Sequence, residues 1–227
     1  MKRSLVKSHT IVWPLLVSSF LSVGLLACRV ISGESWRYWF VLWNLFLAWL
    51  PLLFAFALTR WLNSNRWLSW KGVALTILWL GFLPNSFYLI SDFIHLKDTG
   101  EVSILFDAVL FMTFAWNGLL LGFTAVHMVH VELLKRMPKR HVVQLIAITF
   151  ILCSFAIYLG RYLEWNTWDI LVNPAGILFD LSERVVEPTS YPSTFTTTAL
   201  FAVTLSAMYY SVCKLIDAIR GVEPVSN

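Results

Sequence analysis

Long apolar runs separated by short polar segments make up most of the chain. Crossing the roughly 30 Å hydrocarbon core of a bilayer takes a helix of about 20 residues. Six runs are of that order, at about residues 11–31, 38–59, 73–90, 107–131, 142–160 and 195–216. Lipid offers no partner for unpaired backbone groups, and no stretch alternates as a membrane barrel strand does. The pattern therefore predicts an all-α polytopic membrane helical bundle of about six transmembrane helices.

The segments between the runs are short and show no repeat or low-complexity tract, so we expect one integral membrane domain over residues 1–227. An Asn-Pro break divides the longest connection, 161–193, where we expect short helices on the outer membrane surface. The first run ends in Leu-Leu-Ala-Cys, which is similar to a lipoprotein cleavage box at Cys28. Because the run is longer than a signal core of about 7–15 residues, we expect it to be retained, but cleavage stays open.

Composition agrees with a membrane protein, since 58% of the residues are hydrophobic and 13% are charged, against about a quarter charged in soluble domains. The three cysteines fall in separate runs without the spacing of a metal or redox motif, and no cofactor fingerprint is found. We therefore expect no metal and no cofactor. The net charge of +4 reflects topology rather than nucleic acid binding, and the partner that the composition requires is the lipid bilayer.

The distribution of Lys and Arg predicts the orientation of the chain. Twelve of them lie in the N-terminus, the 60–72 and 132–141 loops and the tail. The other side has five: Arg29, Arg37, Lys97, Arg161 and Arg184. Short cytoplasmic loops carry the excess of basic residues. We therefore expect both termini to be cytoplasmic, with most of the acidic residues on the outer side.

Polar side chains follow the third run towards the outer side. Asn85, Tyr88, Asp92 and His95 are separated by gaps of 3, 4 and 3, so on a continuous helix they lie within about 80° of arc. Pro84 frees a carbonyl near position 80, for which Asn85 is a candidate partner. Asp92 and His95 together fit a carboxylate that orients an imidazole, half of a metal site, or a solvated helix end.

Two further segments reach the same side. Asp107 begins the fourth run, and Asn117 lies about 15 Å below it, where helix packing is the default explanation and ligand contact the alternative. The fifth run ends in YLGRYLEWNTWD, in which Arg161 can pair with Glu164, with an aspartate of the other segments or with a ligand anion. The candidate catalytic residues are Asp92, His95 and Asp107. The candidate ligand-binding residues are Asn85, Tyr88, Asn117, Arg161, Glu164, Trp165, Asn166 and Asp169.

Three segments, FLPNSFYLISDFIHL, FAWNGLLLG and LGRYLEWNTWD, occur in this order. They resemble the signature segments of the bacterial membrane family called domain of unknown function 1361, over most of residues 70–220. The resemblance implies a bacterial polytopic protein, and hence the inner membrane, but no activity. Ser86 and Phe87 depart from the family's Pro-Asn-Ala-Pro-Tyr. The resemblance singles out these residues without giving them roles: Pro84, Asn85, Asp92, His95, Trp116, Asn117, Gly118, Arg161, Trp165, Asn166, Trp168 and Asp169.

These features favour an integral membrane protein whose outward-facing polar site binds a lipid headgroup or small polar ligand. The alternative is an outer-leaflet envelope enzyme that uses an Asp-His-Arg cluster. A small-solute transporter comes third, because the middle of every run lacks charge. A salt-bridge network that locks helix ends explains the same charges without a ligand. Whether the protein is an enzyme, and its oligomeric state, are open at this stage.

Overall fold

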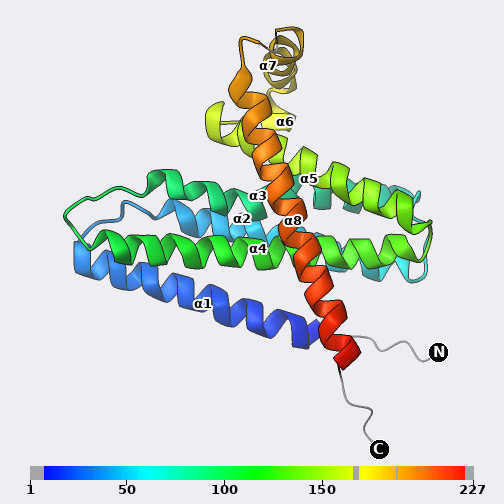
Figure 1. Cartoon of the computed structure of the whole chain (residues 1–227), viewed down its shortest axis with the longest axis horizontal. Coiled ribbons are helices and arrows are strands. Elements are labelled where there is room, and N and C mark those ends of the chain that lie inside the picture. The colour runs from blue at the N-terminus through cyan, green and yellow to red at the C-terminus, as the bar shows by residue number, and fades with distance from the viewer. Residues whose placement is uncertain (1–7, 166–168, 188, 223–227) are drawn as a thin grey trace, which may run out of the picture. The chain divides into compact units, whose positions relative to one another are not determined.

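The computed structural model describes residues 8–165, 169–187 and 189–222, and helices account for most of them. Figure 1 shows the elements, which are α1 (Ser8–Gly33), α2 (Phe40–Leu62), α3 (Trp70–Ser91), the 3-10 helix η1 (Asp92–His95), α4 (Ile104–Leu134), α5 (Lys139–Tyr162), α6 (Asp169–Val172), α7 (Pro174–Val186) and α8 (Pro192–Val222). Strands are absent from these ranges. Helices α1 to α5 and α8 are long and apolar enough to cross a membrane. They confirm the all-α fold and the six predicted spans of a multi-pass membrane protein.

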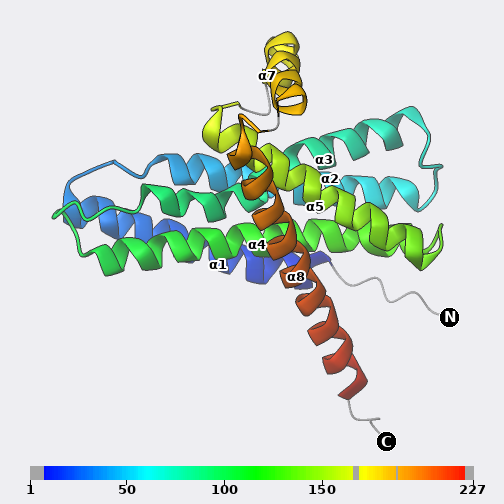
Figure 2. The same ribbon diagram turned by 45° about the horizontal axis from the view of Figure 1, so that its top comes forward.

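The chain divides into two compact units, Met1–Arg136 and Met137–Asn227, which are described separately. In unit 1, α2, α3 and α4 pack against one another and α1 packs against α4. These four helices lie side by side in Figures 1 and 2, and each runs opposite to the one before it. The ends of α1 and α3 therefore lie with the starts of α2 and α4. The predicted single domain over the whole chain stays a prediction.

Close contact between α3 and α4 is made possible by two glycines of α4. A Cβ atom at Gly118 would overlap the backbone carbonyl oxygen of Ser86, and one at Gly122 would lie 2.6 Å from the Phe87 ring. Ser86 also donates a hydrogen bond of 2.9 Å to the carbonyl of Ala48, which links α3 to α2. Packing therefore explains both glycines, as expected of small residues between membrane helices. The two departures from the family pattern, Ser86 and Phe87, are both packing residues here.

In unit 2, α5 packs along α8, and α6 and α7 lie in the connection between them. These two elements confirm the short helices predicted for residues 161–193. The charged face of α7 turns towards the end of α5: the Trp165 indole N–H donates to Asp180 at 2.7 Å, and Arg184 donates to the Tyr158 hydroxyl at 3.4 Å. The opposite face exposes Leu178, Phe179 and Val186. That this face lies on the outer membrane surface stays a prediction.

Candidate functional site

Buried charge gathers at one end of unit 1, where α1 and α3 end and α2 and α4 begin. We call this the polar end. Three ionisable side chains there have no exposed surface: Arg29, Asp92 and Asp107. A charge inside a membrane bundle is costly unless it is paired, and such residues are rare unless they serve structure or function. The contacts of each residue indicate which of the two applies.

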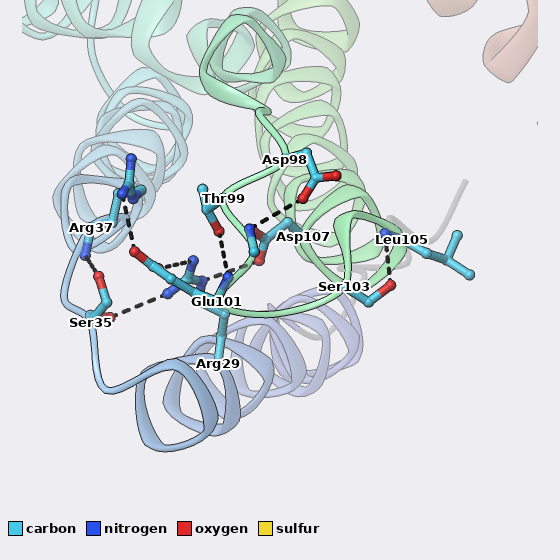
Figure 3. A network of polar contacts seen from close by, with 10 residues as sticks. Arg29, Ser35, Arg37, Asp98, Thr99, Glu101, Ser103, Leu105 and Asp107 are labelled. Carbon is cyan, nitrogen blue, oxygen red and sulfur yellow. Dashed lines mark hydrogen bonds and ion pairs between the residues drawn. The ribbon is translucent and has the colours of Figure 1, made fainter.

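The first group, which we call the Arg29 cluster, consists of Arg29, Arg37, Tyr38, Glu101 and Asp107. Figure 3 shows the Arg29 guanidinium between the carboxylates of Glu101 and Asp107. Its Nε donates to Asp107 at 3.2 Å, its Nη2 to Glu101 at 2.8 Å and its Nη1 to the carbonyl of Ser35 at 3.5 Å. The guanidinium carbon also lies 4.8 Å from the centroid of the Tyr38 ring. Arg29 therefore joins the end of α1 to the start of α4 and to both connecting loops.

Glu101 ties the loop before α4 to this cluster. Besides Arg29 it binds Arg37, whose Nη2 lies 3.0 Å from the second carboxylate oxygen. These hydrogen bonds, that of Arg29 first, hold the pKa of Glu101 below its usual value. The loop turns at Gly100, whose φ of +69° favours glycine, and its N–H donates to Asp98 at 3.2 Å. The loop therefore depends on local turn geometry and on the two arginines together.

Tyr38, in the turn before α2, borders the same cluster. Only 2% of its surface is exposed, and burial followed by the negative charge of Asp107 raises the pKa of its hydroxyl. Its ring meets the Phe111 ring edge-on, with centroids 4.9 Å apart. The Tyr38 ring therefore packs between the charged side chains of the cluster and the apolar core of unit 1.

Sequence reasoning missed Arg29 and Tyr38 as members of a site. Arg29 was used only to predict orientation, yet one signal was present in the first span. Leu15, Ser19, Ser22, Leu26 and Arg29 are buried and separated by gaps of 4, 3, 4 and 3, which place them on one helix face. A buried face that carries two serines and an arginine predicts polar partners on the neighbouring helix.

Asn117 of α4 is the partner of those serines. Its Nδ2 donates to the Ser22 hydroxyl at 2.7 Å and lies within hydrogen-bond distance of the Ser18 and Thr113 carbonyls, at 3.1 and 2.9 Å. The Ser19 hydroxyl donates to its Oδ1 at 3.2 Å. Its predicted role in ligand binding stays a prediction, and it would require one of these bonds to open. The same contacts give α1 a packed place in unit 1, which cleavage at Cys28 would remove.

The second group, which we call the Asp92 cluster, consists of Asn44, Asp92 and His95. Asp92 is buried at the start of η1 and accepts a hydrogen bond of 2.9 Å from the Asn44 amide of α2. His95 ends η1, is exposed, and meets the Phe40 ring edge-on at 4.9 Å. Residues three apart eclipse in a 3-10 helix. The buried carboxylate and the exposed imidazole therefore lie on one side of η1, about 6 Å apart along its axis.

The third span was expected to end near residue 90, and α3 ends at Ser91, after which the chain tightens into η1 instead of continuing as an α-helix through His95. Upstream, the Asn85 amide donates to the carbonyl of Phe82 at 3.0 Å, two residues past the expected position. Tyr88 is half-buried one turn before Asp92. The tighter turn leaves Asp92 and His95 on one side of η1, and the predicted row that joins them to Asn85 and Tyr88 stays a prediction.

Aromatic rings join the two clusters. The Phe93 ring lies 6.0 Å from Phe111, which also contacts Tyr38, and the Phe40 ring lies 6.3 Å from Tyr38. Phe40 in turn contacts His95. The candidate catalytic residues Asp92, His95 and Asp107 thus share one end of unit 1, although each takes part in a different set of contacts.

The remaining candidates belong to unit 2. Arg161 is half-buried in the last turn of α5, and Glu164 is exposed with a left-handed φ of +58°. Trp165 binds the charged face of α7, and Asp169 begins α6. Their predicted roles stay predictions. Two predicted residues lie outside the described ranges: Asn166 and Trp168.

Comparison with protein families gives one result. A family model described as "Protein of unknown function (DUF1361)" matches residues 43–208. The chain belongs to the DUF1361 family. In this DUF1361 protein the matched region contains Asn44, Asp92 and His95, whereas Arg29 and Tyr38 precede it. Comparisons with curated proteins and with solved structures give no match.

The two clusters of this DUF1361 protein offer different chemistry. In the Arg29 cluster, two guanidinium groups and two carboxylates bind one another, an arrangement that fixes helix ends. In the Asp92 cluster, a carboxylate that accepts hydrogen bonds stands beside an imidazole that accepts, donates or carries a proton. Of these two clusters, the Asp92 cluster is the one that exposes an imidazole, that of His95.

Proposed function

We propose that this membrane protein binds a lipid headgroup, or a small polar ligand of the same chemistry, at the Asp92 cluster. The observation that carries the proposal is a fully buried carboxylate, Asp92, one 3-10 turn from an exposed imidazole, His95. An ionisable residue inside a membrane bundle usually marks a binding or proton-transfer site. In this proposal the Arg29 cluster holds the helix ends that form the wall of that site.

The chemistry of the cluster favours a ligand that donates hydrogen bonds. An ionised carboxylate only accepts, and the Asn44 amide already supplies Asp92 with one donor. Acidic residues outnumber basic ones at the polar end, with Glu34, Asp92, Asp98, Glu101 and Asp107 against Arg29, Arg37 and Lys97. Such an excess attracts cations. The ethanolamine headgroup, which carries an ammonium with three donors, fits both features.

We further propose that the polar end faces outward from the inner membrane of a bacterium, with both termini cytoplasmic. Support comes from the other end of unit 1, where basic residues outnumber acidic ones. Among the described residues there, Glu132 is acidic, whereas the basic residues are Arg60, Arg66, Lys71, Lys135 and Arg136. Cytoplasmic ends of membrane helices carry this excess of Lys and Arg.

Catalysis in the outer leaflet is the second candidate, and one observation favours it. Asp92 and His95 are three residues apart on η1, a spacing that would let the carboxylate orient the imidazole as a general base. Asp107 has less support as a catalytic group because Arg29 already engages it. Transport, the third candidate, has the least support, since the buried charges of the polar end lie at helix ends rather than at mid-span.

The proposal is tested by the affinity of the purified protein for phosphatidylethanolamine and phosphatidylcholine, measured by native mass spectrometry in detergent. We expect a preference for phosphatidylethanolamine that falls about tenfold or more in Asp92→Asn, because a hydrogen bond to a charged group contributes about 1.5–3 kcal/mol. The control, Lys97→Gln, changes an exposed cation near the same end and keeps the preference.

Equal affinity for the two lipids in the parent protein would remove the proposal. Conversion of phosphatidylethanolamine to a product that is lost in His95→Ala would instead favour catalysis. A preference that Asp92→Asn leaves intact would place the lipid elsewhere on the protein.

A further inference from the structure

The opposite end of unit 1 has a group of basic and tryptophan side chains. Here α2 and α4 end and α3 begins. We call the group the basic platform: Arg60, Trp61, Arg66, Trp67, Trp70, Lys71, Lys135 and Arg136. It shares no residue with the polar end.

Two tryptophans of the platform are held in place by hydrogen bonds of their indole N–H groups. Trp61 donates to the Ser69 hydroxyl at 2.9 Å, and Trp67 donates to the Thr76 hydroxyl at 3.0 Å. Ser69 also caps α3 by accepting the N–H of Gly72 at 3.2 Å. The end of α2 and the connecting loop are therefore both pinned to the first turns of α3, and the two rings are oriented before any ligand arrives.

Cations lie against these rings. The Lys71 ammonium is 5.0 Å from the centroid of Trp61 and 5.5 Å from that of Trp70, and the Arg136 guanidinium carbon is 5.7 Å from that of Trp67. Such contacts restrain a cation without neutralising it. The platform therefore presents positive charge in defined positions.

Little negative charge offsets it. Glu132 is buried and already binds both Lys135 and Arg136. Within the described part of unit 1, Arg60, Arg66 and Lys71 form no ion pair with a carboxylate, and all three are exposed. Three cations of the described part of unit 1 are thus available to a partner outside this unit.

We propose that the basic platform binds the phosphate of an anionic phospholipid in the leaflet at this end of the protein. The charges fit a phosphate, which arginine and lysine both bind. The surroundings fit a lipid, because the platform joins membrane-spanning helices and exposes Leu68 by 89% and Trp70 by 76%. Tryptophan is also enriched at the level of the lipid headgroups, where its amphipathic ring meets both lipid and water. The inference concerns the opposite charge and the opposite end from the Asp92 cluster, so it does not depend on the proposed function.

The test compares the affinities of the purified protein for phosphatidylglycerol and phosphatidylcholine, titrated by native mass spectrometry in detergent. We expect the parent protein to prefer phosphatidylglycerol, and Lys71→Gln and Arg66→Gln each to weaken that lipid's binding about fivefold. Lys71→Arg keeps the charge and most of the affinity. The matched control, Lys97→Gln, removes an exposed cation at the polar end and leaves the affinity unchanged.

Three results would overturn the inference. The first is equal affinity of the parent protein for the two lipids. The second is a loss of phosphatidylglycerol affinity in Lys97→Gln as large as that in Lys71→Gln, which would indicate an effect of net charge alone. The third is that millimolar inorganic phosphate competes for the site as effectively as the lipid does. Raising the salt concentration provides a check on the parent protein that needs no variant. The preference for phosphatidylglycerol should shrink as screening increases, and an unchanged preference contradicts a phosphate held by exposed cations.

Discussion

The Arg29 cluster and the Asp92 cluster lie at the same end of unit 1 but organise buried charge differently. In the first, two cations and two carboxylates from α1, α4 and the loops before α2 and α4 bind one another. In the second, a buried carboxylate is bonded to an amide and followed, one tight turn later, by an imidazole at the surface. Charges that bind one another fasten helices, whereas in the function proposed above the carboxylate and the exposed imidazole bind a ligand. The predictions below test that division.

The largest effect is expected for Arg29→Met, which leaves Asp107 buried without its cation. Breaking a buried ion pair in this way costs about 3–5 kcal/mol. The double variant Arg29→Met/Asp107→Leu should recover most of the loss, because replacing both partners with apolar groups is often neutral. Unfolding followed by circular dichroism in detergent measures both. A double variant as unstable as the single one would show that the cost of Arg29→Met does not come from leaving Asp107 unpaired.

Asn117→Leu tests whether the satisfied amide in the middle of unit 1 is also structural. It removes the bonds to Ser19 and Ser22 that join α4 to α1, at a cost of about 1 kcal/mol, the usual size of an interhelical hydrogen bond in membranes. Phosphatidylethanolamine affinity should not change. A loss of affinity at unchanged melting temperature would move Asn117 from packing to ligand binding.

The pH dependence of stability should show whether Glu101 stabilises the folded state. Its two arginine partners hold its pKa below the ordinary value of 4.5, so it stabilises the folded state above that pH. This contribution is lost as the pH falls below 4.5, through the pKa of the folded protein. Glu101→Gln should therefore flatten the melting temperature between about pH 5 and pH 3. Identical profiles for the variant and the parent protein would exclude Glu101 as a stabilising partner.

The smallest effect is expected for Arg37→Gln, a matched counterpart to Arg29→Met within the same cluster. Arg37 binds Glu101 as Arg29 does, but its side chain is 49% exposed whereas that of Arg29 is fully buried. Exposed ion pairs contribute little to stability. The melting temperature should change by no more than about 2 °C. A drop comparable to that of Arg29→Met would mean that burial does not set the strength of this network.

The sequence predicted the helices well because a bilayer requires about 20 apolar residues per span, and that length is readable without tertiary information. It also brought Asp92, His95 and Asp107 to one end, since alternating spans place the end of the third with the start of the fourth. The local geometry beyond the third span was not predictable: the chain continues there as η1 rather than as an α-helical turn, and the choice between the two depends on the packing around Asp92.

The contacts of the site were harder to predict because the hydrophobicity of the helices does not determine their order around the bundle. Asn44 is a polar residue of the second span, but its pairing with Asp92 requires that α2 and α3 be neighbours. Arg29 was missed for the same reason, since its ion pair with Asp107 requires that α1 pack against α4. The buried face of α1, with its serines, was the readable signal.

The most direct test of this division is the melting temperature of Asp92→Asn measured beside that of Asp107→Asn in the same detergent. The account predicts a clear fall for Asp107→Asn, which weakens the Arg29 cluster, as expected when a buried ion pair is broken. Asp92→Asn should be unchanged or more stable, because a charge kept for function often strains the fold. An equal fall in both variants would contradict the account and make the Asp92 cluster a second fastener of helix ends.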